Sequence, residues 1–239
     1  MKIALSLVFC FLSLVSSTGA LANADAVKTL LQSRFPEVKA ESITKSAFGG
    51  LYEIFSGNEI FYTDEKVTFI VLGNLMDAKT RENVTEARLR KLTAIPFDQL
   101  PLDLAFKTVL GKGTRKIAVF GDPYCGYCKR FENDILTLKD VTIYTFLYPV
   151  IRAESVTTSK KIWCSADRVK AWQDLMLRNI EPTGDGSCDN PIDKVLAFGQ
   201  KLRVTGTPTS FFEDGERMSG ALPAATIEKK LVSAAAAKK

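Results

Sequence analysis

The sequence predicts two domains, a small α+β domain over residues 23–82 and an α/β domain with a helical insertion over residues 114–239. In the first range, one amphipathic helix precedes short strand-like runs that are separated by turn residues. In the second range, a strand-helix-strand order, a helix-rich segment and a strand-strand-helix order follow one another. Two cysteines separated by two residues stand where the first strand of that range gives way to a helix.

The first 22 residues predict a secretory signal peptide. Lys2 precedes an apolar run from Ile3 to Val15, and the small residues ending at Ala22 suit a cleavage site. The run is too short to span a bilayer comfortably, so we expect no membrane anchor. Removing 22 of the 239 residues leaves 217, and losing Cys10 leaves four of the five cysteines.

Residues 23–82 predict a helix and four strands. Asn23 or Asp25 is suited to cap the helix, and Pro36 ends it. The strand-like runs are Ser42–Phe48, Leu51–Phe55, Glu59–Tyr62 and Val67–Leu72. A core of about sixty residues is marginal by itself, so we expect a dimerisation domain that pairs with a second copy through exposed strand edges.

Residues 83–113 predict a linker helix followed by a connection. Asn83 is suited to cap a helix that runs to about Leu92, and Glu86 stands where a capping box places its acid. The stretch 94–113 contains two prolines and, near its end, two glycines, which is typical of a connecting segment.

Residues 114–239 predict the larger domain. Its expected elements, in chain order, are a strand at Lys116–Gly121, a helix at Cys125–Leu138, a strand at Val141–Tyr148, a helix-rich segment, strands at Thr205–Phe212 and Arg217–Gly220, and a last helix from Pro223. A β-α-β unit followed by a β-β-α unit is the layout of the thioredoxin fold, with the helix-rich segment as an insertion.

Cys125 and Cys128 predict redox chemistry, because two thiols at this spacing can exchange between dithiol and disulfide. We expect Cys125 at the first turn of the helix. Unpaired backbone N–H groups and the positive end of the helix dipole favour an anion there, so its thiol should ionise more easily than a free cysteine.

A CxxC pair can also be half of a structural zinc site, which needs two further ligands. The chain has no histidine, and Cys164 and Cys188 form no second CxxC. We therefore expect no metal site and no cofactor. The lack of histidine also argues against a Cys-His hydrolase, and leaves carboxylates, tyrosines and lysines to handle protons. Asp122 is close in sequence, although it is equally suited to cap the helix.

The formal net charge of +5 is modest and the basic residues are spread along the chain. We therefore expect no nucleic-acid partner.

Cys164 and Cys188 have two interpretations. In an oxidising compartment an even number of cysteines favours a structural disulfide between them. Alternatively, Cys164 is free and buried beside Trp163, and Cys188 is an exposed, reactive thiol in a Gly/Asp-rich loop. We expect the disulfide.

Several motifs in sequence order resemble the DsbC/DsbG family of periplasmic thiol:disulfide interchange proteins, over essentially the whole mature chain. They are Phe120–Cys128, Ile162-Trp163-Cys164, Cys188 and Gly206-Thr207-Pro208. The Gly126-Tyr127 pair between the cysteines is similar to the DsbC branch.

The resemblance implies a homodimer joined through its N-terminal domains and located in the periplasm. Its substrates would be misfolded, disulfide-containing secreted proteins, and a membrane reductase of the DsbD type would keep its cysteines reduced. It also implies that Pro208 is cis, so that the backbone of Thr207 is presented to an extended substrate beside Cys125. Thr207, Pro208, Gly126 and Tyr127 are thus the expected substrate-binding residues.

The implied activity is that of a protein disulfide isomerase and reductase, acting through a mixed disulfide with Cys125. Two alternatives stay open at this point. One is a monomeric thioredoxin-like oxidase or reductase, and the other is a dimeric chaperone, a holdase whose redox activity is secondary.

Overall fold

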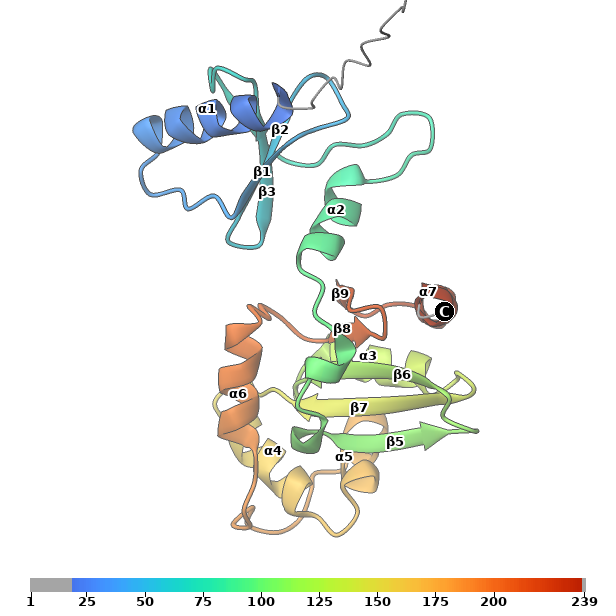
Figure 1. Cartoon of the computed structure of the whole chain (residues 1–239). Helices are drawn as coiled ribbons and strands as arrows, with labels where there is room; N and C mark the ends of the chain where they lie inside the picture. Colours follow the sequence, from blue (N-terminus) through green and yellow to red (C-terminus); the bar gives the residue numbers. More distant parts are fainter. Residues whose placement is uncertain (1–18, 238–239) are drawn as a thin grey trace, which may run out of the picture. The chain divides into compact units, whose positions relative to one another are not determined.

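The computed structural model describes residues 19–237, and its internal contacts divide the chain into two compact units after Thr85 (Figure 1). The predicted signal peptide lies mostly outside the described residues. Within residues 19–237, no helix has both the length and the apolar character needed to cross a membrane.

The first unit packs one helix on a four-stranded antiparallel sheet. Helix α1 (Gly19–Arg34) precedes strands β1 (Ser42–Lys45), β2 (Tyr52–Ser56), β3 (Glu59–Thr63) and β4 (Ile70–Leu72), which pair in that order. Val27 and Leu31 of the helix are fully buried against Tyr52 and Ile54 of β2. The expected helix-and-strands pattern is therefore confirmed.

The predicted cap of the first helix is wrong for this chain. Helix α1 begins at Gly19, so Asn23 and Asp25 lie inside it. The intervening Ala20-Leu21-Ala22 segment favours helix, which lets the helix extend toward the N-terminus. The helix ends before Pro36, as expected, because proline is excluded from a helix interior.

The second unit is built on a five-stranded sheet of order β5-β7-β6-β8-β9. Its strands are β5 (Phe106–Leu110), β6 (Arg115–Gly121), β7 (Val141–Leu147), β8 (Thr209–Phe212) and β9 (Arg217–Ser219). Only β6 and β7 among these pair in parallel. Its helices are α3 (Gly126–Ile135), α4 (Glu154–Cys164), α5 (Arg168–Arg178), α6 (Ile192–Lys201) and α7 (Ala224–Ala237).

Both faces of the central strand β6 are covered. Ile117 and Val119 point to the face that packs on α3 and α7, whereas Ala118 and Phe120 point to the face that packs on α6. Burial on both faces explains why this strand is a continuous apolar run and not an alternating one.

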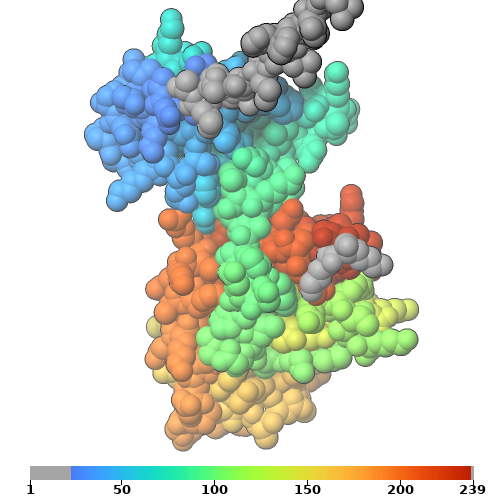
Figure 2. All heavy atoms as spheres, in the orientation of Figure 1, coloured from blue at the N-terminus to red at the C-terminus, as the bar shows by residue number. Residues whose placement is uncertain are grey.

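The segment after α2 (Val84–Leu92) is more structured than a connection. Two short 3-10 helices, Phe97–Gln99 and Leu102–Leu104, precede strand β5, which extends the sheet. Phe97 and Leu100 are buried in the core on the α6 face. Figure 2 shows this green segment crossing the surface of the second unit between orange α6 and the red C-terminal strands. The predicted boundary at residue 114 thus cuts through this unit.

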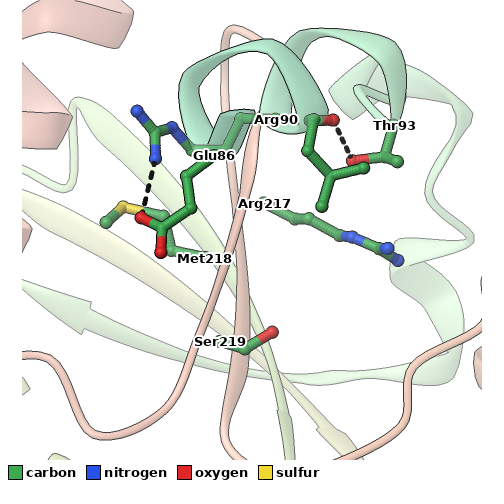
Figure 3. A pocket seen from close by; sticks show the side chains of 7 residues that line it. Glu86, Arg90, Thr93, Arg217, Met218 and Ser219 are labelled. Carbon is green, nitrogen blue, oxygen red and sulfur yellow. Dashed lines mark hydrogen bonds and ion pairs between the residues drawn. The ribbon is translucent and has the colours of Figure 1, made fainter. Parts of the chain in front are cut away.

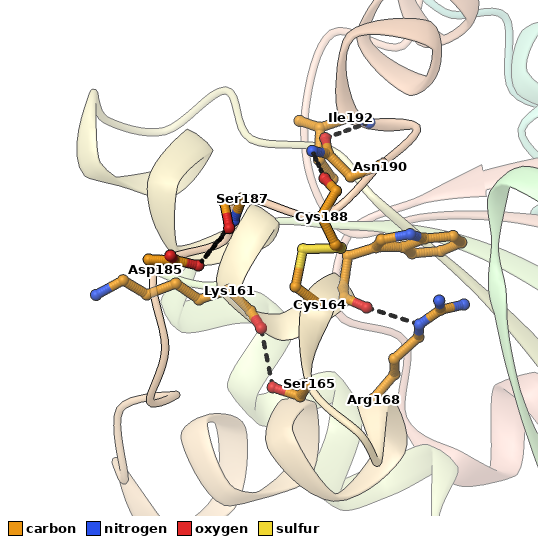
Figure 4. The surroundings of a disulfide bond; sticks show 10 residues. Lys161, Cys164, Ser165, Arg168, Asp185, Ser187, Cys188, Asn190 and Ile192 are labelled. Carbon is orange, nitrogen blue, oxygen red and sulfur yellow. Dashed lines mark hydrogen bonds between the residues drawn. A yellow bond between two sulfur atoms is a disulfide. The ribbon is translucent and has the colours of Figure 1, made fainter.

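A disulfide joins the end of α4 to the loop that precedes α6. The sulfurs of Cys164 and Cys188 are 2.01 Å apart and their Cα atoms 5.7 Å apart. Figure 4 shows the bond beside Asn190, whose side chain donates a hydrogen bond to the Cys188 carbonyl oxygen, and Arg168, which donates one to the carbonyl oxygen of Trp163. The bond therefore closes the helical insertion on itself.

Replacing both bridged cysteines, Cys164→Ala with Cys188→Ala, should lower the free energy of unfolding by about 3 to 4 kcal/mol, because the unfolded chain regains the freedom of the closed loop. Urea unfolding of the oxidised proteins measures this difference. The matched control is Cys125→Ala with Cys128→Ala, which also removes two cysteines but leaves this loop closed. Equal unfolding midpoints for parent and bridge variant would contradict a stabilising role.

Candidate functional site

The two CxxC cysteines lie at the junction of β6 and α3. Cys125 is the residue directly before α3, with extended backbone angles of φ −77° and ψ 115°, and Cys128 is in the first helical turn. Both are free thiols and both are largely buried, with 5 % and 2 % of their surface exposed. The structure therefore places Cys125 at the helix N-terminus, where the sequence predicted it.

Asp122 fixes the turn that carries Cys125. Its buried carboxylate accepts hydrogen bonds from the backbone N–H of Tyr124 at 2.8 Å and from those of Val150 and Ile151 at 2.7 and 2.9 Å. The Ser155 hydroxyl donates a fourth, at 2.9 Å. All four hydrogen bonds of the carboxylate thus hold the cysteine turn against the chain after β7. This favours a structural role for Asp122 over a role in proton transfer.

The pKa of the Cys125 thiol is lowered to about 5. The largest cause is the hydrogen bond that the Cys128 thiol donates to it, and burial opposes this effect. The Thr207 side chain and the backbone N–H groups of Cys128 and Tyr127 are further donors. Cys125 is therefore a thiolate at neutral pH, which is the nucleophilic form.

Cys128 shows the opposite behaviour. Its pKa is raised, first by the same hydrogen bond, in which its proton serves Cys125, and then by burial. One thiol of the pair is thus ionised and the other holds its proton. Cys125 can therefore attack a substrate disulfide as a thiolate, while Cys128 stays protonated and unreactive.

The segment before β8 covers Cys125. The Thr207–Pro208 peptide bond is cis, and the Thr207 carbonyl oxygen lies 3.2 Å from Cys125 Sγ. The Thr207 hydroxyl is buried and has no other hydrogen-bond partner, so it is available to the thiolate. The structure therefore brings together Cys125, Cys128, Thr207 and Pro208 from distant parts of the sequence.

The surface beside the cysteines is apolar and open. Gly126 is exposed, and Tyr127 has 66 % of its surface exposed. Val150 and Ile151, held by Asp122, are 44 % and 51 % exposed. Sequence reasoning missed these last two, although they follow the strand parallel to β6, and the carboxyl ends of parallel strands meet at one edge of a sheet.

Residues 19–237 contain no group of three or more His, Cys, Asp or Glu side chains placed to hold a metal ion. A separate cavity of about 320 Å³ lies between α2 and β9 (Figure 3). Arg90 forms ion pairs there with Glu86 at 3.9 Å and with Glu216 at 3.6 Å, and Arg217 extends beneath the helix. None of the cysteines lines this cavity.

Two family models match the chain, one for each unit. Residues 18–86 match the disulfide bond isomerase protein N-terminal domain, and residues 102–235 match the thioredoxin-like domain. A Bordetella pertussis (strain Tohama I) protein described as a probable thiol:disulfide interchange protein DsbC is 45% identical over 209 residues, which cover 87% of this chain and 74% of that protein. This chain belongs to the DsbC family.

The Escherichia coli (strain K12) DsbC is 25% identical over 223 residues, which cover 90% of this chain and 91% of the relative. A crystal structure of a disulfide interchange protein from Neisseria gonorrhoeae superposes with a TM-score of 0.54 at 37% identity, covering 56% of this chain and 97% of that one. The chain therefore has DsbC-type thiol:disulfide interchange and isomerase function, and its N-terminal domain, being that of DsbC, implies a homodimer.

Alkylation of the reduced protein with iodoacetamide should modify Cys125 with a midpoint near pH 5. Because the folded pKa is lowered, the thiolate persists above this pH and is lost as the pH falls through it. Mass spectrometry of the modified peptide measures the rate. In the Cys128→Ala variant the midpoint should move to higher pH, since the main hydrogen-bond donor is gone. Inertness of both thiols at pH 7 would contradict the assignment of Cys125.

Proposed function

We propose that this protein works in the periplasm as a homodimeric disulfide isomerase and reductase, which reshuffles incorrect disulfides in secreted proteins. One observation supports it most strongly, namely the opposite pKa shifts of Cys125 and Cys128 in a chain of the DsbC family. The predicted signal peptide supports the location, because periplasmic proteins must be exported.

The reaction begins when the Cys125 thiolate attacks a disulfide of the substrate. One substrate sulfur bonds to Cys125, and the other leaves as a thiolate. In isomerisation, a substrate thiolate attacks the mixed disulfide or another bond, a new substrate disulfide forms, and Cys125 is released unchanged. No net electrons are transferred on this route.

Reduction is the second route. Cys128 attacks Cys125 Sγ in the mixed disulfide. The substrate sulfur that was bonded to Cys125 leaves as a thiolate, and a Cys125–Cys128 disulfide remains. Two electrons have then passed to the substrate. Either route starts from the reduced pair, so a membrane reductase of the DsbD type is proposed as the partner that returns those electrons.

Thr207, Pro208, Gly126 and Tyr127 are proposed to bind the substrate chain next to Cys125. The Thr207 carbonyl oxygen lies 3.2 Å from Cys125 Sγ, so a peptide paired with this backbone would present its sulfur to the thiolate. Gly126 has no side chain to obstruct such a peptide, and the exposed Tyr127 ring offers apolar contact.

Dimerisation is proposed to use strand β4, which is one of the two edges of its sheet. An unpaired strand edge is a ready template for a second copy. Apolar side chains are exposed on and beside it, namely Phe69, Val71, Leu72 and Met76, and Leu72 is 82 % exposed. An apolar edge on a domain this small favours pairing with another copy of the same edge.

Reduced protein incubated with a scrambled multi-disulfide substrate should restore native pairing, and Cys125→Ser should not, because serine cannot form the mixed disulfide. Recovered activity of the substrate measures the outcome. Cys128→Ser should keep part of the shuffling, since isomerisation does not need resolution. Equal recovery with parent and Cys125→Ser would contradict the catalytic role and favour a holdase.

Leu72→Asp should convert the dimer into a monomer, because a charge would be buried without a partner at the paired edge. Light scattering after gel filtration measures the molar mass. The matched control is Val232→Asp on α7, an apolar side chain that is 56 % exposed in the second unit, and it should leave the mass unchanged. An unaltered mass for Leu72→Asp would place the interface elsewhere.

A further inference from the structure

Glu132 is a buried carboxyl group one helical turn after Cys128. Only 8 % of its surface is exposed, and its Oε2 accepts a hydrogen bond of 2.9 Å from Trp172 Nε1. Burying a carboxyl group is costly unless it is well partnered. The exchange steps described above make no use of this group.

A small cavity connects Glu132 with the resolving thiol. Its volume is about 10 Å³, the room that the centre of a single water molecule occupies. Cys128, Glu132, Trp172 and Pro208 line it, together with uncharged residues of the sheet and α3. Cys128 and Glu132 are the titratable groups among these lining residues, so the cavity joins one proton donor to one acceptor.

The elements packed around Glu132 bring no competing charge to it. Trp172 is the α5 side chain that contacts it. Of the four charged groups of that helix, Lys170 and Arg178 pair with Asp174, and Arg168 donates to the carbonyl oxygen of Trp163. The sheet contributes Val119, Ile143 and Thr145, and α7 packs on α3 through apolar side chains such as Ile227 and Leu231. On α3 itself, Lys129 is bonded to Asn179.

Gly121 allows this arrangement. A Cβ atom at this position would lie 3.1 Å from the Trp172 ring and 3.9 Å from Cys128 Sγ. Without a side chain there, the indole packs beside the resolving cysteine and holds the Glu132 carboxyl next to the cavity.

Resolution of the mixed disulfide needs a proton acceptor. Once Cys125 is bonded to substrate it is no longer a thiolate, while Cys128 still carries its proton and is 2 % exposed. Burial raises the pKa of Glu132 to about 7, and the Trp172 hydrogen bond opposes the rise. A group with this pKa both accepts and releases a proton near neutral pH, which suits general acid–base catalysis.

We propose that Glu132 accepts the proton of the Cys128 thiol, through a water molecule in this cavity, while Cys128 resolves the mixed disulfide. The Cys128 sulfur then bonds to Cys125 Sγ, the bond from Cys125 to the substrate sulfur breaks, and the substrate leaves as a thiolate. The pair is oxidised and the substrate is reduced by the same two electrons. This role rests on the proposed exchange chemistry of the cysteine pair.

Single-turnover reaction of the reduced protein with oxidised glutathione, stopped with acid, separates the two steps. Glu132→Gln should form the mixed disulfide at the parent rate. Its resolution at pH 7 should be slower on the order of 10²-fold, because the proton acceptor is lost. Resolution in the parent should rise with pH through an inflection near 7, and this inflection should be absent from Glu132→Gln.

Trp172→Phe provides a second readout that keeps the carboxyl group. It removes the hydrogen bond that favours the charged form, so the inflection should move to higher pH. Asp134→Asn is the matched control, a carboxylate on the same helix that does not line the cavity, and it should resolve like the parent.

Identical pH profiles of resolution for the parent and Glu132→Gln would overturn the proposal. If Glu132→Gln does not fold, an inflection left in place by Trp172→Phe would overturn it. Failure of the parent to form any mixed disulfide at Cys125 would instead refute the proposed function.

Discussion

The hydrogen bond from the Cys128 thiol to the Cys125 sulfur is the interaction on which the site depends. It stabilises charge on one sulfur and keeps the proton on the other, so two chemically identical side chains become a nucleophile and a resolving group. Three features of the fold position the two sulfurs for this hydrogen bond. Strand β6 ends and α3 begins at the pair, the buried Asp122 carboxylate holds the turn between them, and the Thr207 backbone lies over the nucleophile.

Burial raises the pKa of Cys125, Cys128 and Glu132 alike, but the three groups end in different charge states. It opposes ionisation at Cys125, where hydrogen-bond donors outweigh it, and reinforces the proton at Cys128. At Glu132, with a single donor from Trp172, burial wins and the acid stays near the midpoint of its titration at neutral pH. The hydrogen bonds that each group makes, rather than depth alone, decide which of them is charged.

Much of this arrangement was predictable from the sequence. The CxxC pair at the end of an apolar run predicted the strand, the helix at Cys125–Leu138 and the ionisable thiol, since these are local patterns. Strand β5 was not recognised because prolines and a glycine flank a short run that gains its order by pairing with β7. Glu132 was not singled out either, because its contact with Trp172 joins residues 40 positions apart.

Because of the disulfide between Cys164 and Cys188, the covalent structure of the second unit depends on the redox conditions, and that of the first unit does not. Residues 19–85 contain no cysteine, so the helix-and-sheet unit folds in the same way whether glutathione is reduced or oxidised. The second unit keeps two extra thiols and an unclosed helical insertion when the chain is synthesised under reducing conditions. The part that carries out the chemistry therefore reaches its bridged form only after two of its own cysteines have been oxidised.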